Sequence, residues 1–179
     1  MLLRLLQFYT PAFLKKKAIR ILANETAGAF RCEAPTLAAL SYEACLKQYA
    51  LFTAEQAQKL ITGNGDTETV KDSLFVSARR LGQELRLRLH IAKPEDVIMA
   101  SRMIYQFLKI DMHADGQEGI RVDKCFFSRY YSDTVCRIIS ALDAGLAEGL
   151  SGGGKLEFYE RITEGYPCCK AHFSLRELK

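Results

Sequence analysis

The spacing of hydrophobic residues changes at about residue 109, and this change limits the fold more than any other feature of the sequence. Before it, apolar residues recur every three to four positions, as they do on one face of an α-helix. After it, short segments alternate apolar and polar residues, as half-buried strands do, and Gly or Pro separates them. We therefore predict an α+β fold in which a helical N-terminal half packs on a C-terminal β-β-α-β-β antiparallel sheet.

The two patterns are expected to belong to one domain, residues 1–179, with a mainly helical part (1–109) and a hairpin–helix–hairpin part (110–179). A chain of this length buries one sizeable core without disulfides, and no linker rich in Pro, Gly or Ser divides it. Apolar spacing and capping residues predict helices over residues 11–24, 35–49, 53–61, 70–85, 94–108 and 132–150. Alternation predicts strands over residues 110–114, 120–126, 156–162 and 168–175.

The distribution of charge argues against a nucleic-acid partner. The net charge is +4, but the first twenty residues contain five basic and no acidic side chains, so the excess belongs to the N-terminus. A nucleic-acid-binding domain instead spreads Lys and Arg along a face or groove. We expect no nucleic-acid partner.

The N-terminal segment, residues 1–17, combines an apolar stretch with Arg4 inside it and three lysines after it. A secretory signal has the opposite order, and no apolar run approaches the ~20 residues of a membrane span. We therefore expect a cytoplasmic protein without a transmembrane segment. The apolar stripe is interpreted as packing on the protein's own core or on a second copy in a homodimer, with peripheral contact to an anionic membrane as the alternative.

Six cysteines are many for this length, and four of them lie in the last 55 residues. The chain is large enough not to need disulfides, which favours a reducing compartment and free thiols. The simplest interpretation of each cysteine is a small buried hydrophobic residue. The clustering of the last four supports a further hypothesis, that some of them form a site.

Cys136 and Asp143 are seven residues apart in the helix predicted over 132–150, so they project within roughly 20° of each other. Ser140 lies near the same line. In the last strand, alternation places Cys169 on the apolar face, which should meet this helix, and His172 on the other face. Cys169 can therefore approach Cys136 and Asp143, and Cys125, at the end of the preceding strand, can join them.

The same residues carry a resemblance to a known family. The segments Lys124-Cys125-Phe126-Phe127, Cys136 to Leu150, Lys155 to Phe158 and Glu164 to Phe173 resemble the L-2-amino-thiazoline-4-carboxylic acid hydrolase family. They are more distantly similar to the V4R (4-vinyl reductase) ligand-binding domain. The resemblance covers about residues 105–175 and implies a V4R-like arrangement of the fold, with Cys125, Cys136, Asp143 and Cys169 at the family's polar positions.

The resemblance implies a hydrolase that opens a small cyclic substrate, such as an amino-thiazoline carboxylate, by adding water at its C=N carbon. Cys136, one turn into its helix, is the candidate nucleophile because a helix N-terminus lowers a thiol pKa. Asp143 would move protons or hold the substrate's ammonium or amidinium group. The predicted catalytic residues are Cys136, Asp143 and Cys169, and the predicted substrate-binding residues are Cys125, Ser140 and Tyr130.

Three alternatives stay open from the sequence. The first is a V4R-type module that binds a small molecule without turnover. The second is a zinc site formed by Cys125, Cys136 and Cys169 with His172 or Asp143, although we expect no cofactor. In the third, the cysteines only pack, and Asp143 caps a helix or pairs with Arg137 or Arg121.

Overall fold

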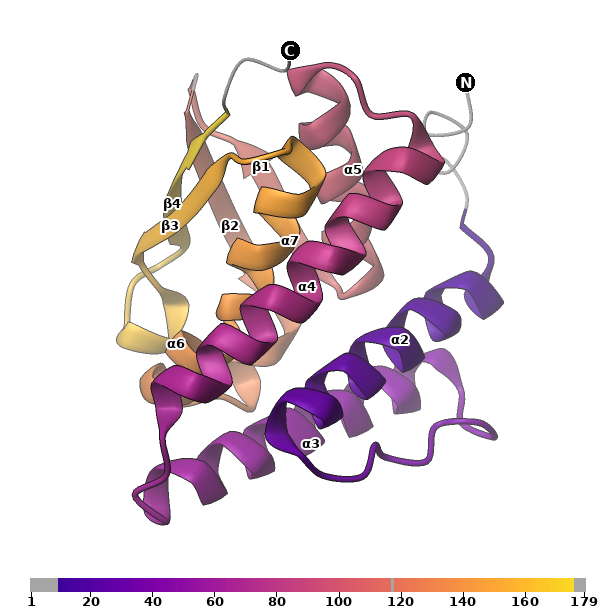
Figure 1. Cartoon of the computed structure of the whole chain (residues 1–179). Coiled ribbons are helices and arrows are strands. Elements are labelled where there is room, and N and C mark those ends of the chain that lie inside the picture. The colour runs from indigo at the N-terminus through magenta and orange to yellow at the C-terminus, as the bar shows by residue number, and fades with distance from the viewer. Residues whose placement is uncertain (1–9, 117, 176–179) are drawn as a thin grey trace.

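The computed structural model describes residues 10–116 and 118–175, so the predicted stripe at the start of the N-terminal segment lies largely outside the described residues. The described part is α+β, with helices packed against a four-stranded antiparallel sheet (Figure 1). The helices are α2 (Ala12–Phe30), α3 (Tyr42–Thr62), α4 (Thr67–Leu89), α5 (Pro94–Phe107), α6 (Asp133–Ile139) and α7 (Ala141–Ser151). The strands are β1 (Ile110–Ala114), β2 (Gly119–Cys125), β3 (Lys155–Glu160) and β4 (Cys169–Ser174), with 3-10 turns η1 (Phe126–Arg129) and η2 (Ile162–Glu164).

The α3 helix corrects two of the sequence predictions, because the helices expected over 35–49 and 53–61 form one helix that begins later. Its N-cap is Ser41, whose hydroxyl accepts a hydrogen bond from the Ala44 amide at 3.2 Å. Thr53 was expected to cap a new helix. Instead its hydroxyl is buried and donates back to the Tyr49 and Ala50 carbonyls, so the helix continues through it.

The sheet has the strand order β1-β2-β4-β3, so β2 and β4 join the two hairpins at its centre. On the inner face, Val122 pairs with Cys169 and Ile120 pairs with Ala171. The outer face carries exposed polar side chains, among them His172. The helices α5 and α7 contact the sheet, and α4 lies across α7 with α2 and α3 beyond it (Figure 1).

Two β-bulges change which side chains face the helices. In β2 the register shifts so that Asp123 is the extra residue, and Cys125 turns inward where strict alternation would turn it outward. In β3 the shift falls between Phe158 and Glu160. The exposed Tyr159 is the extra residue there. Strict alternation along the strand predicted over 156–162 would point Arg161 outward, but it turns toward the core.

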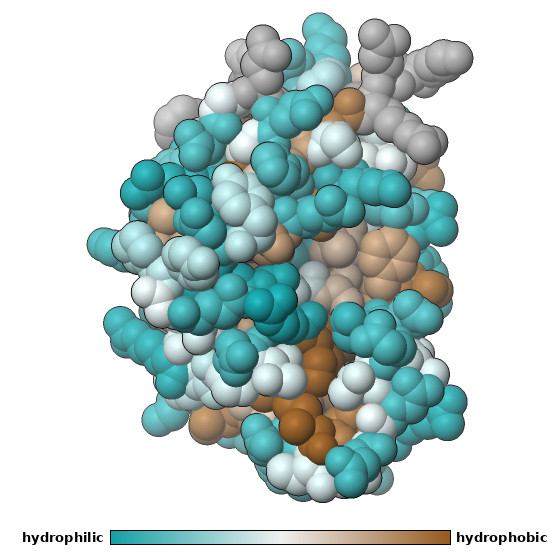
Figure 2. Space-filling view, turned by 90° about the vertical axis from the view of Figure 1, so that its left-hand side faces the viewer, coloured by the Kyte–Doolittle hydropathy of each residue, from teal (hydrophilic) through white to brown (hydrophobic). Residues whose placement is uncertain are grey.

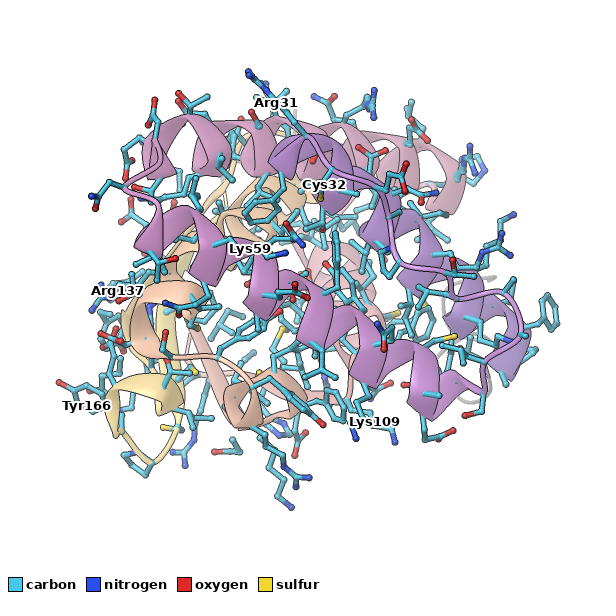
Figure 3. The ribbon with its side chains drawn as sticks, turned by 90° about the horizontal axis from the view of Figure 1, so that it is seen from below. Arg31, Cys32, Lys59, Lys109, Arg137 and Tyr166 are labelled. Carbon is cyan, nitrogen blue, oxygen red and sulfur yellow. The ribbon has the colours of Figure 1, made fainter. Side chains whose placement is uncertain are left out.

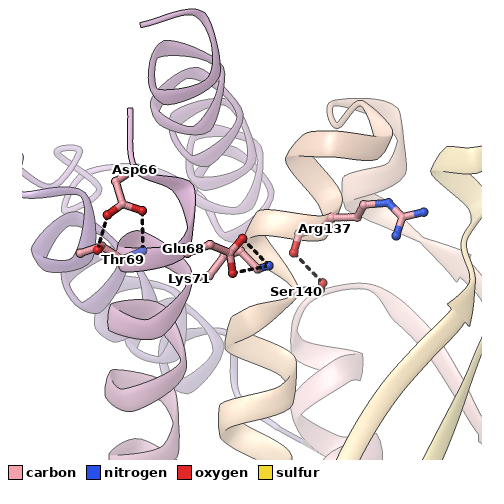
Figure 4. Close-up of polar contacts among 6 residues, drawn as sticks. All are labelled: Asp66, Glu68, Thr69, Lys71, Arg137 and Ser140. Carbon is pink, nitrogen blue, oxygen red and sulfur yellow. Dashed lines mark hydrogen bonds and ion pairs between the residues drawn. The ribbon is translucent and has the colours of Figure 1, made fainter. Parts of the chain in front are cut away.

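The helix predicted over 132–150 is interrupted at Ser140, between α6 and α7. Its start is as expected, because the Ser132 hydroxyl accepts from the Val135 amide. At the break, the Ser140 hydroxyl donates to the Arg137 carbonyl at 3.2 Å (Figure 4). That carbonyl would accept the Ala141 amide in an uninterrupted helix, so the serine side chain competes with the backbone there.

The largest hydrophobic cluster of the described residues runs from Ile19 in α2 to Phe173 in β4, so the helices and the sheet share one core. A smaller cluster joins α3, α4, α6 and the start of α7. Figure 2 shows the side that carries β3 and β4 as mostly hydrophilic, with a hydrophobic hollow in its lower half. Within the described ranges, no helix has both the length and the hydrophobicity to cross a bilayer.

Candidate functional site

A cavity of about 100 Å³ lies where the helices meet the inner face of the sheet. Every helix from α2 to α7 contributes to its wall, as do β1, β2, β4 and both 3-10 turns. Most of the wall is apolar. The sulfur, hydroxyl and carboxyl side chains that line it are Tyr49, Cys125, Ser128, Tyr131, Cys136, Ser140, Asp143, Thr163 and Cys169.

Five of the residues singled out in the sequence line this one cavity, although they come from four separate segments. Three are thiols: Cys125 at the end of β2, Cys136 in α6 and Cys169 at the start of β4. The other two are Ser140 and Asp143. The bulge in β2 turns the first thiol inward, and the pairing of β4 with β2 places the third opposite Val122 on the same inner face. The sheet register therefore assembles the wall.

Asp143 is the one carboxyl group in the wall. The Tyr105 hydroxyl donates a hydrogen bond to its Oδ1 at 2.9 Å, and Tyr105 is itself only 8% exposed. Burial raises the pKa of Asp143 to about 6, because the ionised form loses hydration there. The Tyr105 hydrogen bond and the charge of Arg161 lower this pKa, but by less. Its protonation therefore changes close to neutral pH.

Arg161 supplies the positive charge beside the cavity. Its side chain is only 11% exposed, lies over the Phe158 ring at 4.9 Å and is 3.6 Å from Glu164. Its charge lowers the pKa values of Asp143, Cys136 and Cys169. Asp143 thus faces Arg161 instead of the Arg137 or Arg121 considered from the sequence, which pair with Glu164 and Asp123.

The three thiols have raised pKa values, which corrects the expectation of an activated Cys136. Burial is the main cause at each one and raises the pKa of Cys125 to about 12. At Cys136, Thr163 and Arg161 lower the pKa but do not reverse the effect of burial. The Cys136 amide already donates a hydrogen bond to the Ser132 carbonyl, and α6 is only seven residues long. The helix terminus therefore does little to lower the pKa of this thiol.

The remaining predicted site residues lie elsewhere or are already engaged. Tyr130 does not line the cavity and packs near the Phe126 ring, whereas the adjacent Tyr131 does line it. The Ser140 hydroxyl reaches the cavity but donates to a backbone carbonyl. His172 lies on the outer face of the sheet, stacked near Tyr159 with ring centroids 4.7 Å apart. It therefore cannot join Cys169 in a ligand set.

Neither a histidine base nor a metal-ligand cluster accompanies the thiols in the described part of the chain. None of the chain's three histidines lines the cavity. No group of three or more His, Cys, Asp or Glu among the described residues is arranged to hold a metal ion. The thiol of Cys169 instead accepts a hydrogen bond from the Ile162 amide at 3.3 Å.

Several polar residues of the site were not found from the sequence, among them Tyr49 and Ser128 in the cavity wall. At Tyr105 the hydrophobic spacing predicts only a helix, and strict alternation along the strand predicted over 156–162 places Arg161 on the outer face. Thr163 lies in η2, which was expected to be strand and turn. Its hydroxyl is buried at the cavity and interacts with the Cys136 thiol, whose pKa it lowers. The hydroxyl oxygen can still accept a hydrogen bond from a bound molecule.

Comparison with known proteins adds no family assignment: no protein-family model matches the chain, and no curated protein matches it.

Proposed function

We propose that the protein binds a small, largely apolar organic molecule in this cavity and holds a hydrogen-bond donor of that molecule on Asp143. The observation that carries the proposal is the combination of an apolar wall with one carboxyl group facing the space. Ligand sites typically have this composition, in which apolar surface supplies affinity and few polar groups fix orientation.

The size of the cavity limits the ligand. An apolar cavity of about 150 Å³ holds benzene, and the cavity here is about 100 Å³. A compact five-membered ring, or one end of a longer molecule, suits this space. Both are consistent with the V4R-type binding module suggested by the sequence resemblance.

The polar end of the site supports binding of a donor group. Asp143 keeps a second carboxyl oxygen beyond the one that Tyr105 uses, and Arg161 favours its ionised form. A ligand N–H or O–H placed in the cavity can donate to that oxygen. The oxygen of the buried Thr163 hydroxyl, which also interacts with the Cys136 thiol, can accept a second hydrogen bond from the ligand.

Pyrrole and furan test the proposal, because these rings differ mainly in the N–H donor. We expect pyrrole to bind more tightly in calorimetric titration, by about tenfold for a hydrogen bond to a charged group. The preference should vanish in the double variant Asp143→Leu/Tyr105→Phe, which removes both partners of the hydrogen bond and leaves neither unpaired. Equal binding of pyrrole and furan to the wild type would contradict the role of Asp143.

A cavity-filling variant tests the location. Leu142 is buried and lines the cavity, so Leu142→Phe should weaken binding of both rings. The matched control is Leu87→Phe, which makes the same change at an exposed position of α4 outside the cavity. If both variants bind the rings as the wild type does, the ligand does not occupy this cavity.

The second candidate is ring-opening hydrolysis of a cyclic C–N or C=N compound, and the pKa of Asp143 near 6 favours it. A carboxylate with such a pKa can accept a proton from a water molecule that adds to a C=N carbon, and return it as the ring opens. Because the thiols are held protonated, this role falls to Asp143 and not to Cys136. The wild type, but not Asp143→Asn, should then hydrolyse 2-amino-thiazoline-4-carboxylate, and Cys136→Ser should retain turnover.

A further inference from the structure

A second, more open depression of about 510 Å³ lies on the surface beside the cavity, where β2 continues into η1. Cys125, Ser128 and Ile162 line both the depression and the cavity. These three residues are therefore the shared wall between the two spaces. We call the depression the outer basin.

The rim of the outer basin carries an excess of positive charge. Its basic residues are Lys109, Lys124 and Arg129, and its acidic residue is Asp123. Asp123 is already neutralised, because Arg121 lies 2.6 Å from its Oδ1 and His113 lies 3.7 Å from its Oδ2.

Lys109 lies at the periphery of the molecule, on the opposite side from Arg31 in Figure 3, and its charge is offset by Glu43 of α3, which is 3.5 Å away. The positive charges that remain on the rim belong to two exposed side chains, Lys124 and Arg129. Lys124 and Arg129 form no ion pair with any residue in the described ranges 10–116 and 118–175. An arginine guanidinium also matches the geometry of a carboxylate or phosphate group.

From the shared wall and the uncompensated charges, we infer that the outer basin binds an anionic group, carboxylate or phosphate, of a molecule whose apolar part occupies the cavity. The inference rests on the proposed binding function and specifies its ligand class. The inner cavity alone is smaller than a benzene site, so part of a longer ligand lies outside it. Because Cys125, Ser128 and Ile162 line both spaces, the outer basin is next to the cavity on this side, and there the ligand meets the basic rim.

Hexanoate and hexanamide test the inference, since they share a tail and differ in charge. We expect hexanoate to bind the full-length protein about three- to tenfold more tightly at low salt, as one or two exposed charge contacts allow. The difference should shrink at high salt, because such contacts are screened. Hexyl phosphate identifies the group, since tighter binding than hexanoate indicates a phosphate site and weaker binding a carboxylate site; both support an anionic site.

Charge-removing variants locate the anion. Lys124→Gln and Arg129→Gln should each reduce the advantage of hexanoate over hexanamide and leave hexanamide binding unchanged. The matched control is Lys155→Gln, which replaces an exposed lysine at the start of β3, outside the basin. It should change the binding of neither hexanoate nor hexanamide. A preference for hexanoate that survives both basin variants, or that Lys155→Gln lowers equally, overturns the assignment.

The same titrations separate failure of this inference from failure of the proposed function. If hexanoate and hexanamide bind equally and Leu142→Phe weakens both, the cavity binds ligands but the outer basin does not select anions. If pyrrole, furan and both hexyl compounds fail to bind the wild type, the proposed function itself is wrong, and the inference fails with it.

Discussion

The two sides of α7 differ in how completely they are filled. On the side facing α4, Gly145 and Gly149 allow backbone-to-backbone contact: a Cβ at either position would lie 2.2 Å from a carbonyl oxygen of Phe75 or Arg79. On the other side, Asp143 faces the cavity beside Arg161 and the thiols. One side of the helix is thus fixed by close packing, whereas the other leaves space and carries a charge that burial disfavours. Functional sites commonly carry such a cost, which the surrounding structure supports.

The largest expected effect is on the packed side. Gly149→Ala should lower the free energy of unfolding by about 3 kcal/mol, because neither backbone can move away from the new methyl group without separating α4 from α7. Thermal denaturation should show a fall in Tm of about 10 °C. The clash outweighs the helix propensity that alanine gains over glycine, which is about 1 kcal/mol.

Gly28→Ala is the matched control, since no atom lies within 4 Å of a Cβ built at this exposed position of α2. It should raise the free energy of unfolding by up to ~1 kcal/mol. If Gly149→Ala is equally harmless, the α4–α7 contact is not as close as described, and the contrast between the two sides of α7 disappears.

On the cavity side, we expect the substitution Asp143→Asn to stabilise the protein at neutral pH. The pKa of Asp143 rises from 3.8 to about 6 on folding, so the folded state binds the proton more tightly than the unfolded state does. The free energy of unfolding of the wild type should therefore fall, relative to Asp143→Asn, as the pH rises from about 4 to about 6. Above pH 6, the free energy of unfolding of the wild type relative to that of Asp143→Asn should stay about 2–3 kcal/mol below its value at pH 4. Urea denaturation of both proteins across this pH range measures the difference. If the free energy of unfolding changes with pH in the same way for both, folding does not raise the pKa of Asp143.

The α+β class and the positions of most strands follow from hydrophobic spacing, but the composition of the site depends on two features that spacing does not reveal. Alternation places Cys169 inward, as observed, because β4 is regular. It fails at Arg161, which directly follows β3, since a single extra residue, Tyr159, reverses the faces of the residues after it. The bulge at Asp123 acts on Cys125 in the same way. A bulge is set by the partner strand's register, which no local pattern encodes.

The site's electrostatics were harder to predict than its composition. The position of Cys136 near a helix start suggested a lowered thiol pKa, which holds only for a solvent-accessible helix terminus with free amides. In the folded chain, desolvation dominates and raises this pKa. Desolvation depends on which other elements cover the thiol, and η2 with Thr163 was not recognised as one of them. The sequence identified the residues that line the cavity better than it identified their protonation states.

The smallest expected effect concerns these thiols and tests whether the cavity side activates a nucleophile. Site-resolved alkylation with iodoacetamide should modify Cys136 more slowly than free glutathione at neutral pH. Because burial raises the pKa of Cys136, its rate should still be rising at the pH where the rate for glutathione has levelled off. Asp143→Asn should increase the rate by about twofold, because the charge of Asp143 raises the pKa of Cys136 and its removal lowers it. The exposed-position variant Leu87→Phe should leave the rate unchanged. Rapid modification of Cys136 below pH 7 would restore the thiolate mechanism suggested by its place in the sequence, and would mean that Arg161 and Thr163 outweigh burial at this end of the cavity.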